Sequence, residues 1–74
     1  MTQINLIITK SGINVQTPYN EKFIKMIKNI PFQNRMWVKE LKAWFVTFDW
    51  EQEMKTAVEA CYDNPIYRIK ENWN

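Results

Sequence analysis

The sequence predicts a small α+β domain, built from a mostly antiparallel sheet and two packed helices in the order ββαββαβ. In several stretches apolar residues alternate with other residues, which is the period of a half-buried strand. Two other stretches repeat their apolar residues at helical spacing, and turns rather than helices join most of the strands. The chain has 74 residues, so we expect one domain spanning 1–74. Its four Trp, four Phe and three Tyr enlarge the core, because each large aromatic buries about 150–250 Å².

The first two strands are predicted at residues 3–9 and 13–17. Apolar residues or Thr recur at every second position in both stretches. The segment 10–12, Lys-Ser-Gly, lies between them and is a tight-turn signal, in which we expect Gly12 to supply a positive φ. Pro18 ends the second strand, so these residues form a first hairpin.

A first helix is predicted between Asn20 and Pro31. Asn20 is a good N-cap, and Tyr19 and Ile24 stand where the two residues of a hydrophobic staple would lie. At 100° per residue one side of the helix gathers Phe23, Met26, Ile27 and Ile30. The opposite side carries Lys22, Lys25 and Lys28. This lysine side is either ordinary solvated surface or a stripe that faces phosphates.

Residues 35–48 are predicted to form a central hairpin with a four-residue loop at 39–42. Apolar residues alternate on the way out of the loop, as in a strand with one buried face. This register places Trp37 directly across from Trp44, a type of pair that stabilises antiparallel strands. We expect both rings to lie mainly in the core. The alternative is that Trp37 is exposed and acts as a stacking ring.

A second helix and a last strand complete the prediction. Asp49 is expected to cap the helix, with Gln52 as its capping-box partner, and residues 64–65, Asn-Pro, end it. The apolar side of this helix consists of Trp50, Met54, Ala57, Val58 and Cys61. Its exposed side is acidic and carries Glu51, Glu53 and Glu59. Residues 66–70 form the last strand, after which we expect Trp73 to pack against the domain.

The composition argues against an enzyme and against a metal or other cofactor. The chain has no His and one Cys, and its acidic residues lack the spacing of metal ligands. Cys61 falls on the apolar side of a helix without a base nearby, so it is expected to be a core thiol. Glu51 and Glu53 are two apart on a helix and do not face each other. Gly12 is the only glycine, which leaves no glycine-rich phosphate loop.

The lone cysteine also bears on where the protein works. It cannot form an internal disulfide, which fits a reducing, cytoplasmic compartment. The sequence holds no apolar run long enough to span a membrane, and its polar start does not read as a signal peptide. We therefore expect a cytoplasmic protein without a membrane partner.

Charge is unevenly distributed along the chain. Residues 1–48 contain seven Lys and Arg and two acidic residues, whereas residues 49–74 contain three and six. The net charge of +2 is small, so the separation is the more informative feature. It indicates a molecule with one side that faces anions, or simply a mixed surface.

The central hairpin combines basic and aromatic residues. Arg35, Lys39 and Lys42 are interleaved with Trp37 and Trp44. Single-stranded nucleic acid is commonly held this way, with cations on phosphates and rings stacked on bases. If the rings lie in the core, the cations alone would give salt-sensitive binding that tolerates many sequences.

Residues 12–46 contain four characteristic segments. They are Gly12-Ile-x-Val15-x-Thr-Pro18-Tyr19-Asn20, Phe23-Ile24-x-x-Ile27-Lys28-x-Ile30-Pro31, Arg35-x-Trp37 and Lys42-x-Trp44-x-Val46. Together these segments resemble the HARP (HepA-related protein) domain. The chain departs from the family pattern at Phe32, where a glycine usually follows the proline. HARP domains accompany annealing helicases, and similar segments occur in phage and mobile-element proteins. The resemblance implies recognition of forked or partly single-stranded DNA, without motor activity.

Three functions remain open from the sequence. The first is a non-catalytic accessory module that binds single-stranded or forked DNA. Its contact residues would be Lys22, Lys25, Lys28, Arg35, Trp37, Lys39 and Lys42. The second is a small inhibitor or adaptor that binds a protein partner through the acidic helix, as a nucleic-acid mimic, or through a sheet edge. The third is a homodimerising domain whose exposed aromatics form the interface.

Overall fold

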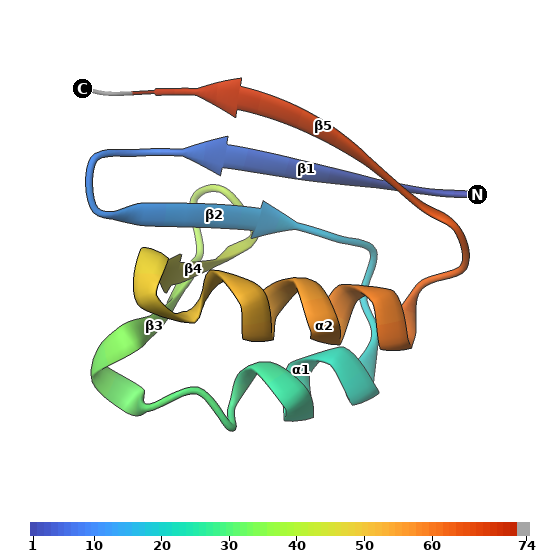
Figure 1. The fold of residues 1–74 in the computed structure, drawn as a ribbon, viewed down its shortest axis with the longest axis horizontal. Helices are drawn as coiled ribbons and strands as arrows, with labels where there is room; N and C mark the ends of the chain where they lie inside the picture. Colours follow the sequence, from blue (N-terminus) through green and yellow to red (C-terminus); the bar gives the residue numbers. More distant parts are fainter. Residues whose placement is uncertain (73–74) are drawn as a thin grey trace.

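The computed structural model describes residues 1–72 and shows a five-stranded sheet with both helices packed on one face (Figure 1). The strands and helices, in chain order, are β1 (Thr2–Ile8), β2 (Gly12–Gln16), α1 (Glu21–Ile27), β3 (Arg35–Val38), β4 (Ala43–Thr47), α2 (Glu51–Cys61) and β5 (Pro65–Glu71). Short 3₁₀ turns at Phe32–Asn34 and Phe48–Trp50 precede β3 and α2. The predicted α+β class and the order ββαββαβ are confirmed.

The strands lie in the order β3-β4-β2-β1-β5. The pairs β1–β2, β2–β4 and β3–β4 are antiparallel, so the prediction of a mostly antiparallel sheet is confirmed. β5 is the exception, because it pairs in parallel with β1 along its whole length. Figure 1 shows how this arises: α2 crosses the face of the sheet and delivers the chain to the edge beside β1.

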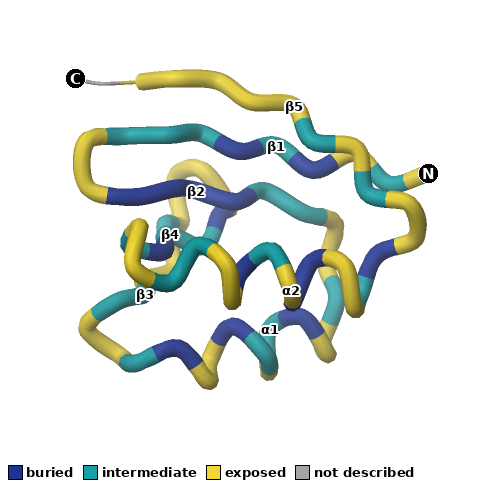
Figure 2. The backbone as a smooth tube through the Cα atoms, in the orientation of Figure 1, coloured by how far each residue is buried: buried dark blue, intermediate teal, exposed yellow. Residues whose placement is uncertain are grey.

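The core lies between the sheet and the two helices. Alternate strand residues such as Ile4, Leu6, Ile13, Val15 and Val46 point toward the helices and are 0–2% exposed. They meet Phe23 and Ile27 of α1 and Met54, Ala57 and Val58 of α2 in one cluster. Figure 2 shows the contrast between β2, buried along most of its length, and β5, which is largely exposed.

Gly12 does not have the positive φ that we predicted. Position 12 requires glycine because of packing. A Cβ at this position would lie 2.6 Å from the ring of Phe45 and would clash with the main-chain oxygen of Val46. Both residues belong to β4, which pairs with β2. The positive φ values occur at Lys42 and Asn64, where the chain turns into β4 and β5.

The start of α1 is as predicted, whereas the start of α2 is not. The side chain of Asn20 accepts a hydrogen bond from the main-chain N–H of Phe23 over 2.9 Å. The expected capping box of Asp49 and Gln52 is wrong. Asp49 lies inside a 3₁₀ turn that runs directly into α2, and the N-cap is Trp50, whose side chain makes no capping bond within the described chain. A residue inside such a turn cannot adopt the extended conformation that an N-cap needs.

The remaining boundaries differ slightly from the predictions. α1 ends at Ile27, one turn before Pro31, and single turns continue the chain to Ile30. β5 extends to both sides of the predicted strand at 66–70. The expected packing of Trp73 lies outside the described residues.

Candidate nucleic-acid interface

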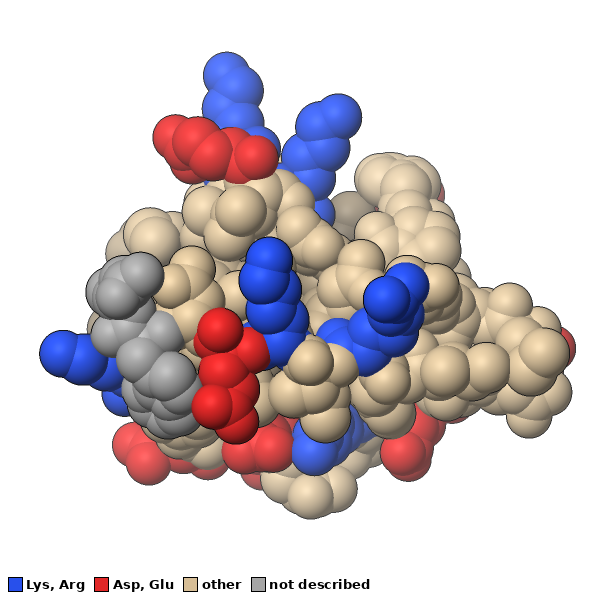
Figure 3. Space-filling model, turned by 90° about the horizontal axis from the view of Figure 1, so that it is seen from above, with Lys and Arg blue, Asp and Glu red and all other residues tan. Residues whose placement is uncertain are grey.

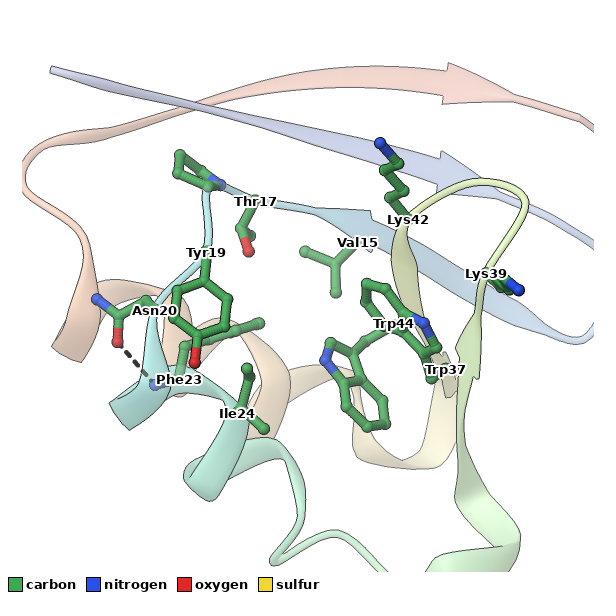
Figure 4. Close-up of a pocket in the computed structure, with 11 residues that line it drawn as sticks. Val15, Thr17, Tyr19, Asn20, Phe23, Ile24, Trp37, Lys39, Lys42 and Trp44 are labelled. Carbon is green, nitrogen blue, oxygen red and sulfur yellow. Dashed lines mark hydrogen bonds between the residues drawn. The ribbon is translucent and has the colours of Figure 1, made fainter.

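A hollow of about 370 Å³ opens between the β3–β4 hairpin and the start of α1 (Figure 4). Tyr19 and Ile24 lie on one side of it, and the indoles of Trp37 and Trp44 lie on the other. The other residues around it are Val15, Thr17, Pro18, Asn20, Phe23, Lys39 and Lys42. Volumes of this size are typical of small-ligand sites.

The hairpin register creates the tryptophan side of the hollow. Trp37 of β3 is directly opposite Trp44 of β4, as the sequence predicted, and both point to the helix side of the sheet. Their ring centroids are 5.5 Å apart and the ring planes are tilted by 60°. Trp44 is partly buried and packs against the core, in line with the expectation for it. Trp37 is 49% exposed, so the expectation that its ring lies mainly in the core is wrong. β3 is an edge strand, and one side of Trp37 therefore lacks a neighbouring strand.

Hydrogen bonds fix the opposite side of the hollow. The hydroxyl of Tyr62 lies 2.6 Å from the carbonyl oxygen of Pro18 and 2.9 Å from the hydroxyl of Thr17. A carbonyl oxygen can only accept, so Tyr62 donates to Pro18 and the Thr17 hydroxyl donates to Tyr62. These bonds anchor the segment that carries Tyr19. Burial raises the pKa of Tyr62 above its usual value, and the bond with Thr17 offsets part of that rise.

Two lysines stand at the rim of the hollow. Lys39 and Lys42 begin and end the hairpin loop, and both are exposed. Their amino groups are directed outward, away from the tryptophans (Figure 4). The loop is held to β2 by a bond of 2.8 Å from the Gln16 amide to the oxygen of Leu41. The hollow is thus apolar inside and basic at its edge.

Arg35 is placed differently from the other predicted contact residues. It lies on the same face of β3 as Trp37 and is half-buried. Its Nε donates to the carbonyl oxygen of Ile30 over 2.9 Å, and its guanidinium carbon lies 5.7 Å from the centre of the Phe32 ring. These contacts tie β3 to the end of α1, so part of the side chain already serves the fold.

The three lysines of α1 and its C-cap, Lys22, Lys25 and Lys28, are all exposed, and none of them lines the hollow. Ile24 lines the hollow, and Lys28, four residues later, lies on the same side of the helix. At 100° per residue Lys25 is turned about 100° from Ile24 and Lys22 about 160°. The structure therefore groups Lys39 and Lys42 with Trp37 around the hollow, whereas Lys22, Lys25 and Lys28 do not line it.

Charged side chains of both signs share the face of the molecule that carries β5. Figure 3 views the molecule from above the β5 edge. Lys and Arg side chains are spread over this face, with Asp and Glu beside them at the top and in the centre, and further Asp and Glu side chains lie along the lower border. On α2, Glu53 and Glu59 are exposed, and Glu51 forms an ion pair of 3.0 Å with Lys55.

The sequence reasoning missed Tyr19 as a part of the candidate site. Tyr19 was assigned to a hydrophobic staple with Ile24, yet its side chain is 82% exposed and faces the hollow. The signal was available, because Tyr19 stands between Pro18, which ends the second strand, and Asn20, which caps a helix. A bulky aromatic between these two residues has little room to reach the core.

Residues 1–72 contain no group of three His, Cys, Asp or Glu side chains that could hold a metal ion. Cys61 is partly buried with its Sγ 3.7 Å from the Sδ of Met26. Neither helix in this part of the chain combines the length and the apolar character needed to cross a bilayer.

The chain is a small α+β domain with an aromatic hollow that has two lysines at its rim. The chain matches no protein-family model, no curated protein and no solved structure.

Proposed function

We propose that this protein is a non-catalytic DNA-binding module that holds single-stranded or forked DNA mainly through contacts to phosphates. The observation that carries the proposal is the position of Lys39 and Lys42 at the rim of the hollow that the half-exposed ring of Trp37 lines. Cations beside an accessible aromatic face suit a strand whose phosphates and bases are both exposed. The resemblance of residues 12–46 to the HARP domain supports the same function.

The proposal is tested by fluorescence anisotropy of labelled single-stranded, duplex and forked DNA at several salt concentrations. We expect binding that weakens as salt rises, with a log–log slope that counts the phosphates engaged. Tighter binding to the fork or to the single strand than to duplex is expected. If none of the three DNAs binds at low salt, the proposal is wrong.

A protein-binding function is the second candidate, favoured by a separate apolar surface. Phe32 is 81% exposed and Met36 is 59% exposed, and with Phe45 they line a shallow hollow of about 300 Å³. Met36 points to the face of the sheet opposite to Trp37, because it pairs with Phe45. Exposed apolar groups of this kind mark protein interfaces, including those of homodimers. A tight dimer in sedimentation, together with no affinity for DNA, would favour this function.

A further inference from the structure

We infer that the hollow between Tyr19 and Trp37 receives one unpaired nucleobase, which stacks on these rings while its flanking phosphates meet the lysines at the rim. This inference rests on the proposed DNA-binding function and specifies what the aromatic side chains add to it. The ligand class is therefore a single strand with accessible bases, not an isolated phosphate.

Two aromatic rings of the hollow are exposed. In a domain of 74 residues each large aromatic is valuable to the core, because burying one removes about 150–250 Å² from water. Tyr19 is nevertheless 82% exposed and Trp37 is 49% exposed, on opposite sides of the same hollow. The anchors behind them are rigid: Trp37 packs beside Trp44, and Tyr62 fixes the segment before Tyr19. A flat ligand would find its aromatic faces already in position.

The charge pattern of the hollow is basic at the rim and apolar inside. The residues that line the hollow include two lysines and no acidic side chain among those described. Both amino groups point outward from the rim. A nucleotide has the complementary pattern, with an apolar, planar base and a negatively charged phosphate on each side. An aliphatic ligand would gain nothing from the lysines, and a cationic ligand would be repelled by them.

Stacking on the rings should tolerate different bases, because every base has a flat face. Two polar side chains of the hollow are already engaged: the Asn20 amide bonds Phe23 and Cys61, and the Thr17 hydroxyl donates to Tyr62. The donors that remain in the lining are the Tyr19 hydroxyl, the two indole N–H groups and the lysines at the rim. We expect the rings to supply most of the contact with the base, so binding should tolerate different sequences.

The test compares a short oligothymidylate with an abasic strand of the same length and charge, by anisotropy over a series of salt concentrations. We expect the abasic strand to bind about 5- to 150-fold more weakly, the range given by one stacked base. Both strands should show the same salt slope, because they carry the same phosphates. Equal affinity for the two strands would overturn the base-stacking inference and leave the proposed function intact. If neither strand binds, both fail.

Single substitutions test which side chains hold the base. Tyr19→Ala and Trp37→Ala should each weaken binding to oligothymidylate without changing its salt slope, and Tyr19→Phe should retain the affinity. Phe32→Ala is the matched control, because it removes an equally exposed ring (81%) outside the hollow. Circular dichroism checks folding, and Tyr19→Ala remains informative if Trp37→Ala does not fold. Unchanged discrimination between the two strands in folded Tyr19→Ala would place the base elsewhere and overturn the assignment.

Discussion

The side chain of Asn20, just before α1, donates a hydrogen bond from Nδ2 to the main-chain oxygen of Cys61, the last residue of α2, over 3.3 Å. Its Oδ1 accepts from the N–H of Phe23 at the same time. One amide thus caps α1 and ties the two helices together. Because Tyr19 precedes it directly, this amide also fixes the α1 side of the hollow.

The two bonds of Asn20 can be separated by substitution. Ser caps a helix about as well as Asn but is too short to reach Cys61, whereas Ala does neither. We expect Asn20→Ser to lower the free energy of unfolding by about 0.5–1.5 kcal/mol and Asn20→Ala by about 1 kcal/mol more. Urea denaturation measures both, with Asn29→Ser as an exposed control. If Asn20→Ser is as stable as the parent, the bond to Cys61 contributes nothing.

Removing the hydroxyl should have opposite effects at two tyrosines. The Tyr62 hydroxyl is bonded to Pro18 and Thr17, while the buried Tyr67 hydroxyl has no hydrogen-bond partner among residues 1–72. We expect Tyr62→Phe to lower the free energy of unfolding by about 1–3 kcal/mol, and Tyr67→Phe to leave it unchanged or raise it by up to about 1 kcal/mol. Thermal unfolding compares the two, and destabilisation by Tyr67→Phe would contradict the assignment.

Stability should fall at alkaline pH. Burial raises the pKa of Tyr62 and of Tyr67 above the usual 10.0, and for Tyr67 the nearby Glu59 adds to the rise. Below about pH 10 both groups are neutral in the folded and unfolded states. Above it the unfolded chain loses these protons first, so the free energy of unfolding decreases as pH rises. Urea midpoints from about pH 8 to about pH 11 should show this decrease. The double variant Tyr62→Phe with Tyr67→Phe should flatten it, and an equally steep curve would count against these two groups.

Gly12→Ala should be strongly destabilising although Gly12 has an ordinary φ. The new Cβ would collide with the Phe45 ring and with the oxygen of Val46. We expect a loss of more than about 2 kcal/mol, as for an overpacked core. Adding Phe45→Ala should restore only part of it, because the Val46 carbonyl belongs to the β2–β4 pairing and cannot move aside. Full rescue by Phe45→Ala would show that the ring alone requires glycine.

Charge reversal at the hairpin should abolish DNA binding. Lys39→Glu with Lys42→Glu places two negative charges at the rim, where they repel the phosphates, so anisotropy should detect no binding at low salt. Both side chains are exposed, so the fold should persist. The control Lys10→Glu with Lys70→Glu changes the net charge equally at exposed positions that do not line the hollow. Equal losses in the two double variants would mean that only overall charge matters.

Local sequence patterns were sufficient for much of the fold. Alternation and a four-residue loop set the hairpin register, and with it the pairing of Trp37 and Trp44. Asn20 before an amphipathic stretch gave the start of α1. These features depend on residues close together in the chain, where side-chain periodicity and capping chemistry act directly. The grouping of Trp37, Lys39 and Lys42 follows from the same register.

Long-range packing decided what the sequence pattern could not. Periodicity shows which side chains of a strand share a face, but not which strand lies beside it, so the parallel pairing of β5 with β1 was not predicted. For the same reason local patterns could not show that the close approach of Phe45 is what requires glycine at position 12. The hollow exists because edge strand β3 leaves Trp37 without a neighbour while α1 holds Tyr19 opposite. The sequence alone determined the elements and the rim of the candidate site, and only the tertiary structure placed an open aromatic space between them.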